Sequence, residues 1–140
     1  MITFVLTYLD QEIIMEANAF TGTCECNSTY NGNPVGENFS TEKVVFDRRL
    51  FKADMGAQFV QIIYPAELDP GTHDLVFVSE GVPQLQYHNG KKLLTLTGTG
   101  KVTIGPNLDT QVGTIDANYF DDIGRLIAFK GEFTAKYELK

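Results

Sequence analysis

The amino-acid sequence predicts an all-β fold, either an antiparallel β-sandwich or a small closed β-barrel of about nine to ten strands connected mostly by hairpins. Three observations predict this class. Polar and apolar residues alternate along most segments. Turn signals rich in Gly, Pro and Asn recur at short spacing. No stretch keeps helical spacing with a cap at both ends. The 140 residues suit one domain, so residues 1–140 are expected to form a single β domain.

The first fourteen residues allow two interpretations. The run Ile2–Leu9 is apolar, but no Lys or Arg precedes it, as a secretory signal would require. It is also much shorter than the roughly twenty apolar residues that cross a membrane as a helix. Residues 1–14 are therefore expected to be either a first strand or an N-terminal extension that precedes Met15.

Strand patterning is clear from Phe20 onward. The segment Phe20–Cys26 alternates and predicts a strand with both cysteines on one face. Residues 27–41 are polar and rich in Gly and Asn, which predicts a long polar loop or a hairpin tip. The next strand changes register near Arg48, where a bulge or turn is expected. Gln58–Tyr64 is apolar on both sides, which is typical of a central strand.

The second half of the chain is patterned as a meander. Asn89-Gly90 is the strongest short hairpin signal, since both residues tolerate positive φ. The closing strands alternate over residues 114–119 and 127–139, and the turn between them is expected at 121–124. Gly131 lies midway along the buried face of the last strand. It predicts a bend where that strand crosses a barrel corner or passes from one sheet to another.

Charge and cysteine content exclude several classes of function. The net charge of -7 and the absence of a convincing basic patch argue against binding to nucleic acid or to an anionic membrane. Cys24 and Cys26 share a strand face and have no second cysteine pair, so we expect two buried thiols and neither a disulfide nor a metal site. The sequence therefore predicts a soluble, acidic, cytoplasmic protein.

No residues are predicted to be catalytic, to bind a metal or to hold a cofactor. His73 and His88 lie at turns, where solvated side chains are usual, and no serine lies in a nucleophile-elbow sequence. The acidic residues near Asp69 and at Asp121-Asp122 do not match a calcium-binding loop. The Gly-rich segments do not join a strand to a helix, as phosphate-binding loops do.

Three hypotheses for function follow. The first is a non-enzymatic β-domain that acts by protein–protein interaction or self-association, with Gln58–Tyr64 or Ile2–Leu9 supplying an edge strand. The second is a small β-barrel carrier that encloses an apolar small molecule. The third is a hydrolase whose site is not recognisable. The aromatic side chains that would line the cavity of a carrier are Phe59, Phe77, Tyr119, Phe129, Phe133 and Tyr137.

Overall fold

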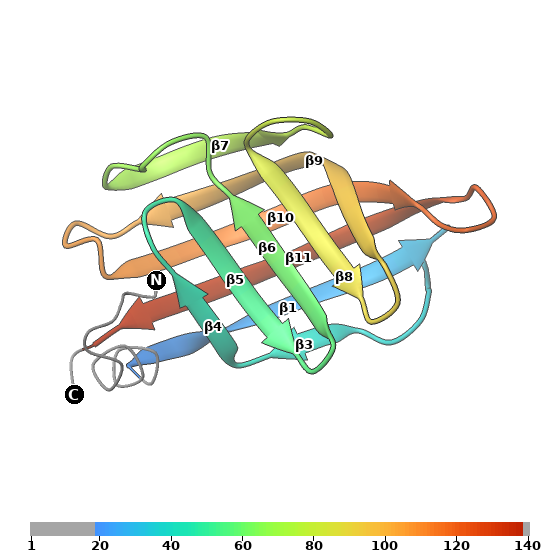
Figure 1. Ribbon diagram of the computed structural model, residues 1–140, viewed down its shortest axis with the longest axis horizontal. Coiled ribbons are helices and arrows are strands. Elements are labelled where there is room, and N and C mark those ends of the chain that lie inside the picture. The colour runs from blue at the N-terminus through green and yellow to red at the C-terminus, as the bar shows by residue number, and fades with distance from the viewer. Residues whose placement is uncertain (1–18, 139–140) are drawn as a thin grey trace.

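The computed structural model describes residues 19–138, and these residues form β-strands, turns and loops. The strands are antiparallel and curl into a half-barrel, which confirms the all-β prediction (Figure 1). The segment 1–14 lies outside the described residues. Within residues 19–138 the chain has no helix with the length and apolar character that crossing a bilayer requires.

The structure has eleven strands in the described residues, two of them very short. They are β1 (Phe20–Tyr30), β2 (Asn33–Pro34), β3 (Phe39–Thr41), β4 (Lys43–Phe46), β5 (Leu50–Met55), β6 (Gln58–Ile63), β7 (Gly71–Phe77), β8 (Gln84–Asn89), β9 (Leu93–Ile104), β10 (Thr110–Phe120) and β11 (Leu126–Tyr137).

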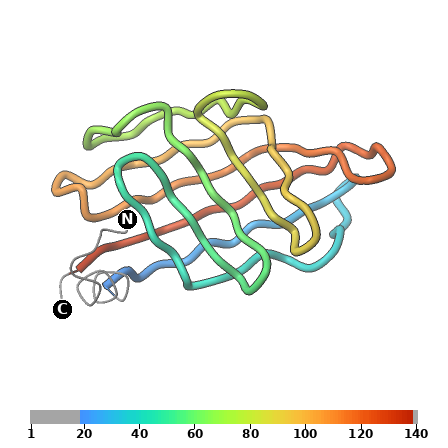
Figure 2. Tube along the Cα trace, in the orientation of Figure 1, coloured from blue at the N-terminus to red at the C-terminus, as the bar shows by residue number. Residues whose placement is uncertain are grey.

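The strands are hydrogen-bonded in the order β2-β1-β11-β10-β9-β8-β6-β5-β4, while β3 pairs with β1 and β7 pairs with β9. In Figures 1 and 2, β4, β5, β6 and β8 form one layer that lies across β10, β11 and β1. The long strand β9 belongs to both layers. Its first residues pair with β8, and its later residues pair with β7 and β10.

The chain passes from one layer to the other at Gly98 in β9, and not at Gly131 in β11 as the sequence predicted. Gly98 has a φ of 142°, and a Cβ atom there would lie 2.5 Å from the Cα atom of Ala117. The strand that contains Gly131 pairs with β1 and β10 over nearly its whole length. Gly131 instead allows a close approach between strands, since a Cβ atom there would lie 2.5 Å from Cys26 Sγ.

The segment 27–41 is more ordered than the long loop expected from its composition. Strand β1 continues to Tyr30, and a tight turn at Asn31 (φ 53°) and Gly32 (φ 80°) leads into β2. Strand β3 then pairs with the middle of β1. The alternative expectation of a hairpin tip describes the first part of the segment, because Asn and Gly accept the positive φ that a two-residue turn needs.

Several predicted elements are confirmed by the strand pairings. The hairpin at Asn89-Gly90 joins β8 to β9, and the turn at 121–124 joins β10 to β11. Gln58–Tyr64 contains β6, which lies centrally because it pairs with β5 and β8. The suggestion that this segment supplies an open edge is therefore wrong. Among the described residues, β7 pairs with β9 alone and is an edge strand.

Large apolar side chains of both layers fill the interior of the half-barrel. The rings of Phe51 and Phe133 stack with their centroids 4.2 Å apart. Strands β10 and β11 bury alternate residues, as their sequence patterns predict. The largest fully buried apolar side chains are Phe39, Phe51, Phe129, Phe133, Ile62, Leu85, Leu96, Ile127, Val60 and Val102.

Candidate functional site

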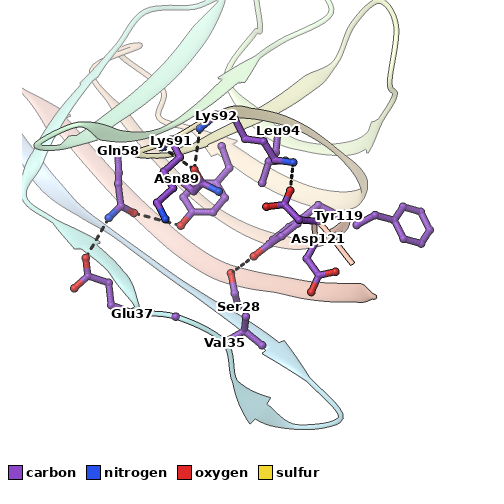
Figure 3. A pocket seen from close by; sticks show the side chains of 14 residues that line it. Ser28, Val35, Glu37, Gln58, Asn89, Lys91, Lys92, Leu94, Tyr119 and Asp121 are labelled. Atoms are coloured by element: carbon purple, nitrogen blue, oxygen red, sulfur yellow. Dashed lines mark hydrogen bonds and ion pairs between the residues drawn. The ribbon is translucent and has the colours of Figure 1, made fainter. Parts of the chain in front are cut away.

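A pocket of about 350 Å³ opens at the end of the half-barrel where the β8–β9 and β10–β11 turns approach the end of β1 (Figure 3). We call it the hairpin pocket. Figure 2 shows the β10–β11 turn extending outward at this end of the molecule. The residues that line the hairpin pocket are Ser28, Val35, Gly36, Glu37, Gln58, Tyr87, Asn89, Lys91, Lys92, Leu94, Tyr119, Phe120, Asp121 and Asp122.

The β8–β9 turn holds two lysines at the edge of the hairpin pocket. Asn89 Oδ1 accepts hydrogen bonds from the backbone N–H groups of Lys91 (2.9 Å) and Lys92 (3.0 Å). Gly90 between them has a φ of 94°, which glycine adopts without strain. The side-chain oxygen of Asn89 therefore stabilises the turn and is no longer available to a ligand.

The β10–β11 turn is built around the carboxylate of Asp121. That carboxylate accepts hydrogen bonds from the backbone N–H groups of Ile123 (3.1 Å) and Arg125 (2.8 Å) and from Arg125 Nε (2.7 Å). Desolvation acts to raise the pKa of Asp121, but the hydrogen bonds from Arg125 and Ile123 outweigh it and lower the pKa. An ion pair between Lys92 and Asp122 links this turn to the β8–β9 turn.

Two tyrosines contribute hydroxyl groups to the hairpin pocket. Tyr119 donates to Ser28 Oγ at 3.0 Å, and Tyr87 donates to Gln58 Oε1 at 3.3 Å. Gln58 Nε2 in turn donates to Glu37 Oε1 at 3.2 Å. Burial, followed by the charge of neighbouring Tyr119, raises the pKa of Tyr87 to about 12. Tyr87 is therefore a neutral hydrogen-bond donor at physiological pH.

Beside the hairpin pocket, the β10–β11 hairpin exposes three large apolar side chains. Phe120 is 66% exposed, Ile123 is 78% exposed and Leu126 is 51% exposed. Phe120 and Leu126 lie directly opposite each other across the two strands. We call these three side chains the apolar tip. Phe120 also lines the hairpin pocket, so the apolar tip begins at the edge of the pocket.

Of the six aromatic residues expected to line a cavity, Tyr119 lines the hairpin pocket. Phe129 packs behind it, with its ring centroid 6.2 Å from that of Tyr119 and 4.7 Å from that of Tyr87. Both Phe129 and Phe133 are buried in the core. The structure therefore brings Tyr119 and Phe129 together behind an open pocket.

The other predicted cavity residues lie apart from the hairpin pocket. Phe77 is buried, and its ring lies 3.0 Å from where a Cβ atom on Gly100 would be. Phe59 is half-buried, and its ring stacks on His88 with a centroid separation of 5.5 Å. Tyr137 packs against Phe20, where β1 begins and β11 ends.

The histidines make structural contacts close to their own turns. The backbone N–H of Gly90 donates to His88 Nδ1 at 3.1 Å, and His73 Nε2 donates to the carbonyl oxygen of Asp69 at 2.7 Å. Within residues 19–138, neither imidazole has a carboxylate partner. These contacts orient each ring beside its own turn.

Cys24 and Cys26 are buried, and their sulfur atoms lie 3.9 Å apart. The hydrogen bond of the Cys26 thiol with Cys24, together with burial, raises the pKa of Cys26, which disfavours the thiolate that metals and electrophiles need. The described part of the chain contains no cluster of three or more side chains of metal-ligating type.

Comparison of the chain with protein-family models, curated proteins and solved structures gives no match. The functional argument therefore depends on the geometry of the hairpin pocket. Ser28, Lys91 and Phe120 were not among the predicted site residues, and each is ordinary in its local sequence. Of the features predicted from the sequence, the turns at Asn89-Gly90 and 121–124 and the aromatic residue Tyr119 contribute to this surface.

Proposed function

We propose that this chain is a non-enzymatic binding domain that recognises a protein through the surface formed by the hairpin pocket and the apolar tip. The observation that carries the proposal is the exposure of Phe120, Ile123 and Leu126 together on one hairpin. Isolated exposed apolar residues are common on protein surfaces, but a group of them beside a pocket is typical of a binding site. The partner is either another protein or a second copy of this chain.

The packing of the core favours protein recognition over the carrier hypothesis. A Cβ atom on Gly113 would overlap the ring of Phe133, and one on Gly100 would lie 3.0 Å from the ring of Phe77. Phenylalanine rings thus fill the space that these glycines leave on neighbouring strands. An apolar ligand would have to displace them, at the cost of close-packed contacts.

The strand pairings also support the small-barrel form of the fold over the sandwich. Strand β3 pairs with β1 in one layer, and β4, which follows after Glu42, pairs with β5 in the other. A bent connection of this kind joins the layers on the side opposite β9. It also places the segment that contains Glu37 beside the end of β1, where it lines the hairpin pocket.

Photocrosslinking tests the proposal. A benzoylphenylalanine at Ile123, in the full chain and in an extract of cells that express it, is expected to form one discrete adduct. The matched control is the same residue at Val76, which is 65% exposed on β7 and does not line the hairpin pocket. The substitution Phe120→Ser should weaken the adduct at Ile123.

The mass of the adduct identifies the kind of partner. An adduct of two copies of this chain would indicate self-association, and any other discrete mass would indicate a different protein. Equal labelling from Ile123 and Val76, or no discrete adduct from Ile123, would contradict the proposed function.

A further inference from the structure

We infer that the hairpin pocket receives a carboxylate, presented by an acidic side chain of the partner protein next to an apolar one. The inference rests on the proposed function and names the chemistry that the same surface recognises. Lys91 supplies the positive charge, while Ser28 and Asn89 supply uncharged hydrogen-bond donors. The apolar tip contacts the neighbouring apolar side chain.

The charges around the hairpin pocket leave one ammonium group without a partner. Of the acidic side chains in the hairpin pocket, Asp121 pairs with Arg125 and Asp122 pairs with Lys92, while Glu37 accepts a hydrogen bond from the neutral amide of Gln58. Lys91 makes neither an ion pair nor a side-chain hydrogen bond with any residue in 19–138. The ammonium group of Lys91 is therefore available to an anionic ligand.

Ser28 provides an independent indication of the same preference. Ser28 is only 7% exposed, and its Oγ atom accepts a hydrogen bond from the hydroxyl of Tyr119. The hydroxyl proton of Ser28 has no acceptor among the described residues. A buried donor without an acceptor is costly, so a ligand oxygen at this position would be stabilising.

Asn89 adds a third donor at the β8–β9 turn. Its Oδ1 atom is occupied by the backbone of the turn, and its Nδ2 group donates to no acceptor within residues 19–138. Figure 3 shows Ser28 from β1 and Asn89 and Lys91 from the β8–β9 turn around the same pocket. Three donors without a partner among the described residues suit an oxygen-rich anion.

The surrounding charge selects a singly charged group. Glu37, Asp121 and Asp122 also line the hairpin pocket, and the whole chain carries a net charge of -7. A doubly charged phosphate would meet this field with only one unpaired ammonium to balance it, whereas a carboxylate matches Lys91 in charge. The apolar tip beside the pocket favours an acidic residue that has an apolar neighbour in sequence.

The test measures the binding of two pairs of probes to the full chain, and each pair has one charged and one neutral member. Binding is monitored by the shifts of amide resonances in NMR. The peptides are acetyl-Leu-Glu-Leu-amide and acetyl-Leu-Gln-Leu-amide, and the small molecules are hexanoate and hexanamide. We expect the Glu peptide to bind about fivefold more tightly than the Gln peptide. The shifts should include the side-chain NH₂ of Asn89 and the backbone of Lys91.

Two lysine variants separate local recognition from overall charge. Lys91→Gln should abolish the preference for the Glu peptide. Lys130→Gln removes the same charge from an exposed position on β11 outside the hairpin pocket and should preserve that preference. An equal loss in both variants would overturn the inference, because it would assign the effect to net charge.

The remaining outcomes are equally decisive. Equal binding of the charged and neutral probes, or no binding of either peptide, overturns the inference. Tighter binding of hexanoate than of the Glu peptide overturns the assignment to a protein partner and indicates a free carboxylic acid. The crosslink from Ile123 tests the proposed function separately, so failure of one result is distinguishable from failure of the other.

Discussion

Gln111 connects several segments by hydrogen bonds at one end of the half-barrel. This end is at the start of β10, and the hairpin pocket is at the end of β10. The residue is 2% exposed, and its Oε1 atom accepts a hydrogen bond of 2.7 Å from the hydroxyl of Tyr64. Its Nε2 group donates to the carbonyl oxygen of Asp47 at 2.8 Å. One carboxamide thus links the start of β10 to the residue after β6 and to the β4–β5 turn.

The substitution Gln111→Leu keeps the size of the side chain but leaves two polar partners unsatisfied. Each unsatisfied buried group costs about 1–3 kcal/mol, and burial of the leucine offsets part of the loss. We expect the free energy of unfolding to fall by about 2–4 kcal/mol. Tyr64→Phe removes one donor and leaves only the oxygen of Gln111 unpaired, so it should cost about 1–2 kcal/mol.

The double variant Tyr64→Phe with Gln111→Leu tests whether the two side chains interact. Because it removes both ends of one hydrogen bond, its cost should be smaller than the sum of the single costs by about 1 kcal/mol or more. Urea unfolding at 25 °C, with the midpoint and the slope fitted separately, measures all three values. Additivity within about 0.5 kcal/mol would refute the argument.

Three further predictions concern pH, packing and thiol reactivity. Because the pKa of Tyr87 is raised to about 12 and the unfolded residue titrates near 10, the unfolded chain loses this proton first. Stability should therefore fall by about 1.4 kcal/mol per pH unit between those values, and urea melts of Tyr87→Phe should show a shallower fall. Gly113→Ala would make a methyl group overlap the ring of Phe133, so thermal unfolding should report a loss of about 1–3 kcal/mol of stability. In urea, the rate at which iodoacetamide alkylates Cys24 and Cys26 should equal the rate at which the chain unfolds. Rapid alkylation of the folded chain would contradict the burial of the two thiols.

Local alternation predicted which residues face the core, because side chains on a strand point to opposite faces in turn. Residues 114–119 and 127–137 follow that rule in the structure. The position of the passage between layers could not be predicted in the same way. Gly98 and Gly131 both interrupt long strands, and only their partner strands determine which one bends and which one allows close packing.

The hairpin pocket could not be predicted because no single segment contains it. Ser28, Lys91 and Phe120 lie far apart in the chain, and the strand register brings them to one end of the half-barrel. Each residue has an ordinary local setting at the end of a strand or in a turn. Two of the aromatic side chains predicted to line a cavity, Phe77 and Phe133, lie against glycines on adjacent strands, and the pattern along one strand does not reveal such a contact.

The two ends of the half-barrel differ in how completely their polar groups are satisfied. At one end, Gln111 uses its oxygen and its amide nitrogen in hydrogen bonds with buried or backbone partners. At the other end, Lys91 and the hydroxyl proton of Ser28 have no acceptor among the described residues, and Phe120 is exposed to solvent. Stability alone would favour an acceptor for the buried hydroxyl of Ser28, and the proposed function assigns this end of the half-barrel to binding. Substitutions near Gln111 should therefore change unfolding without changing recognition, whereas Lys91→Gln should change recognition and leave unfolding nearly unaltered.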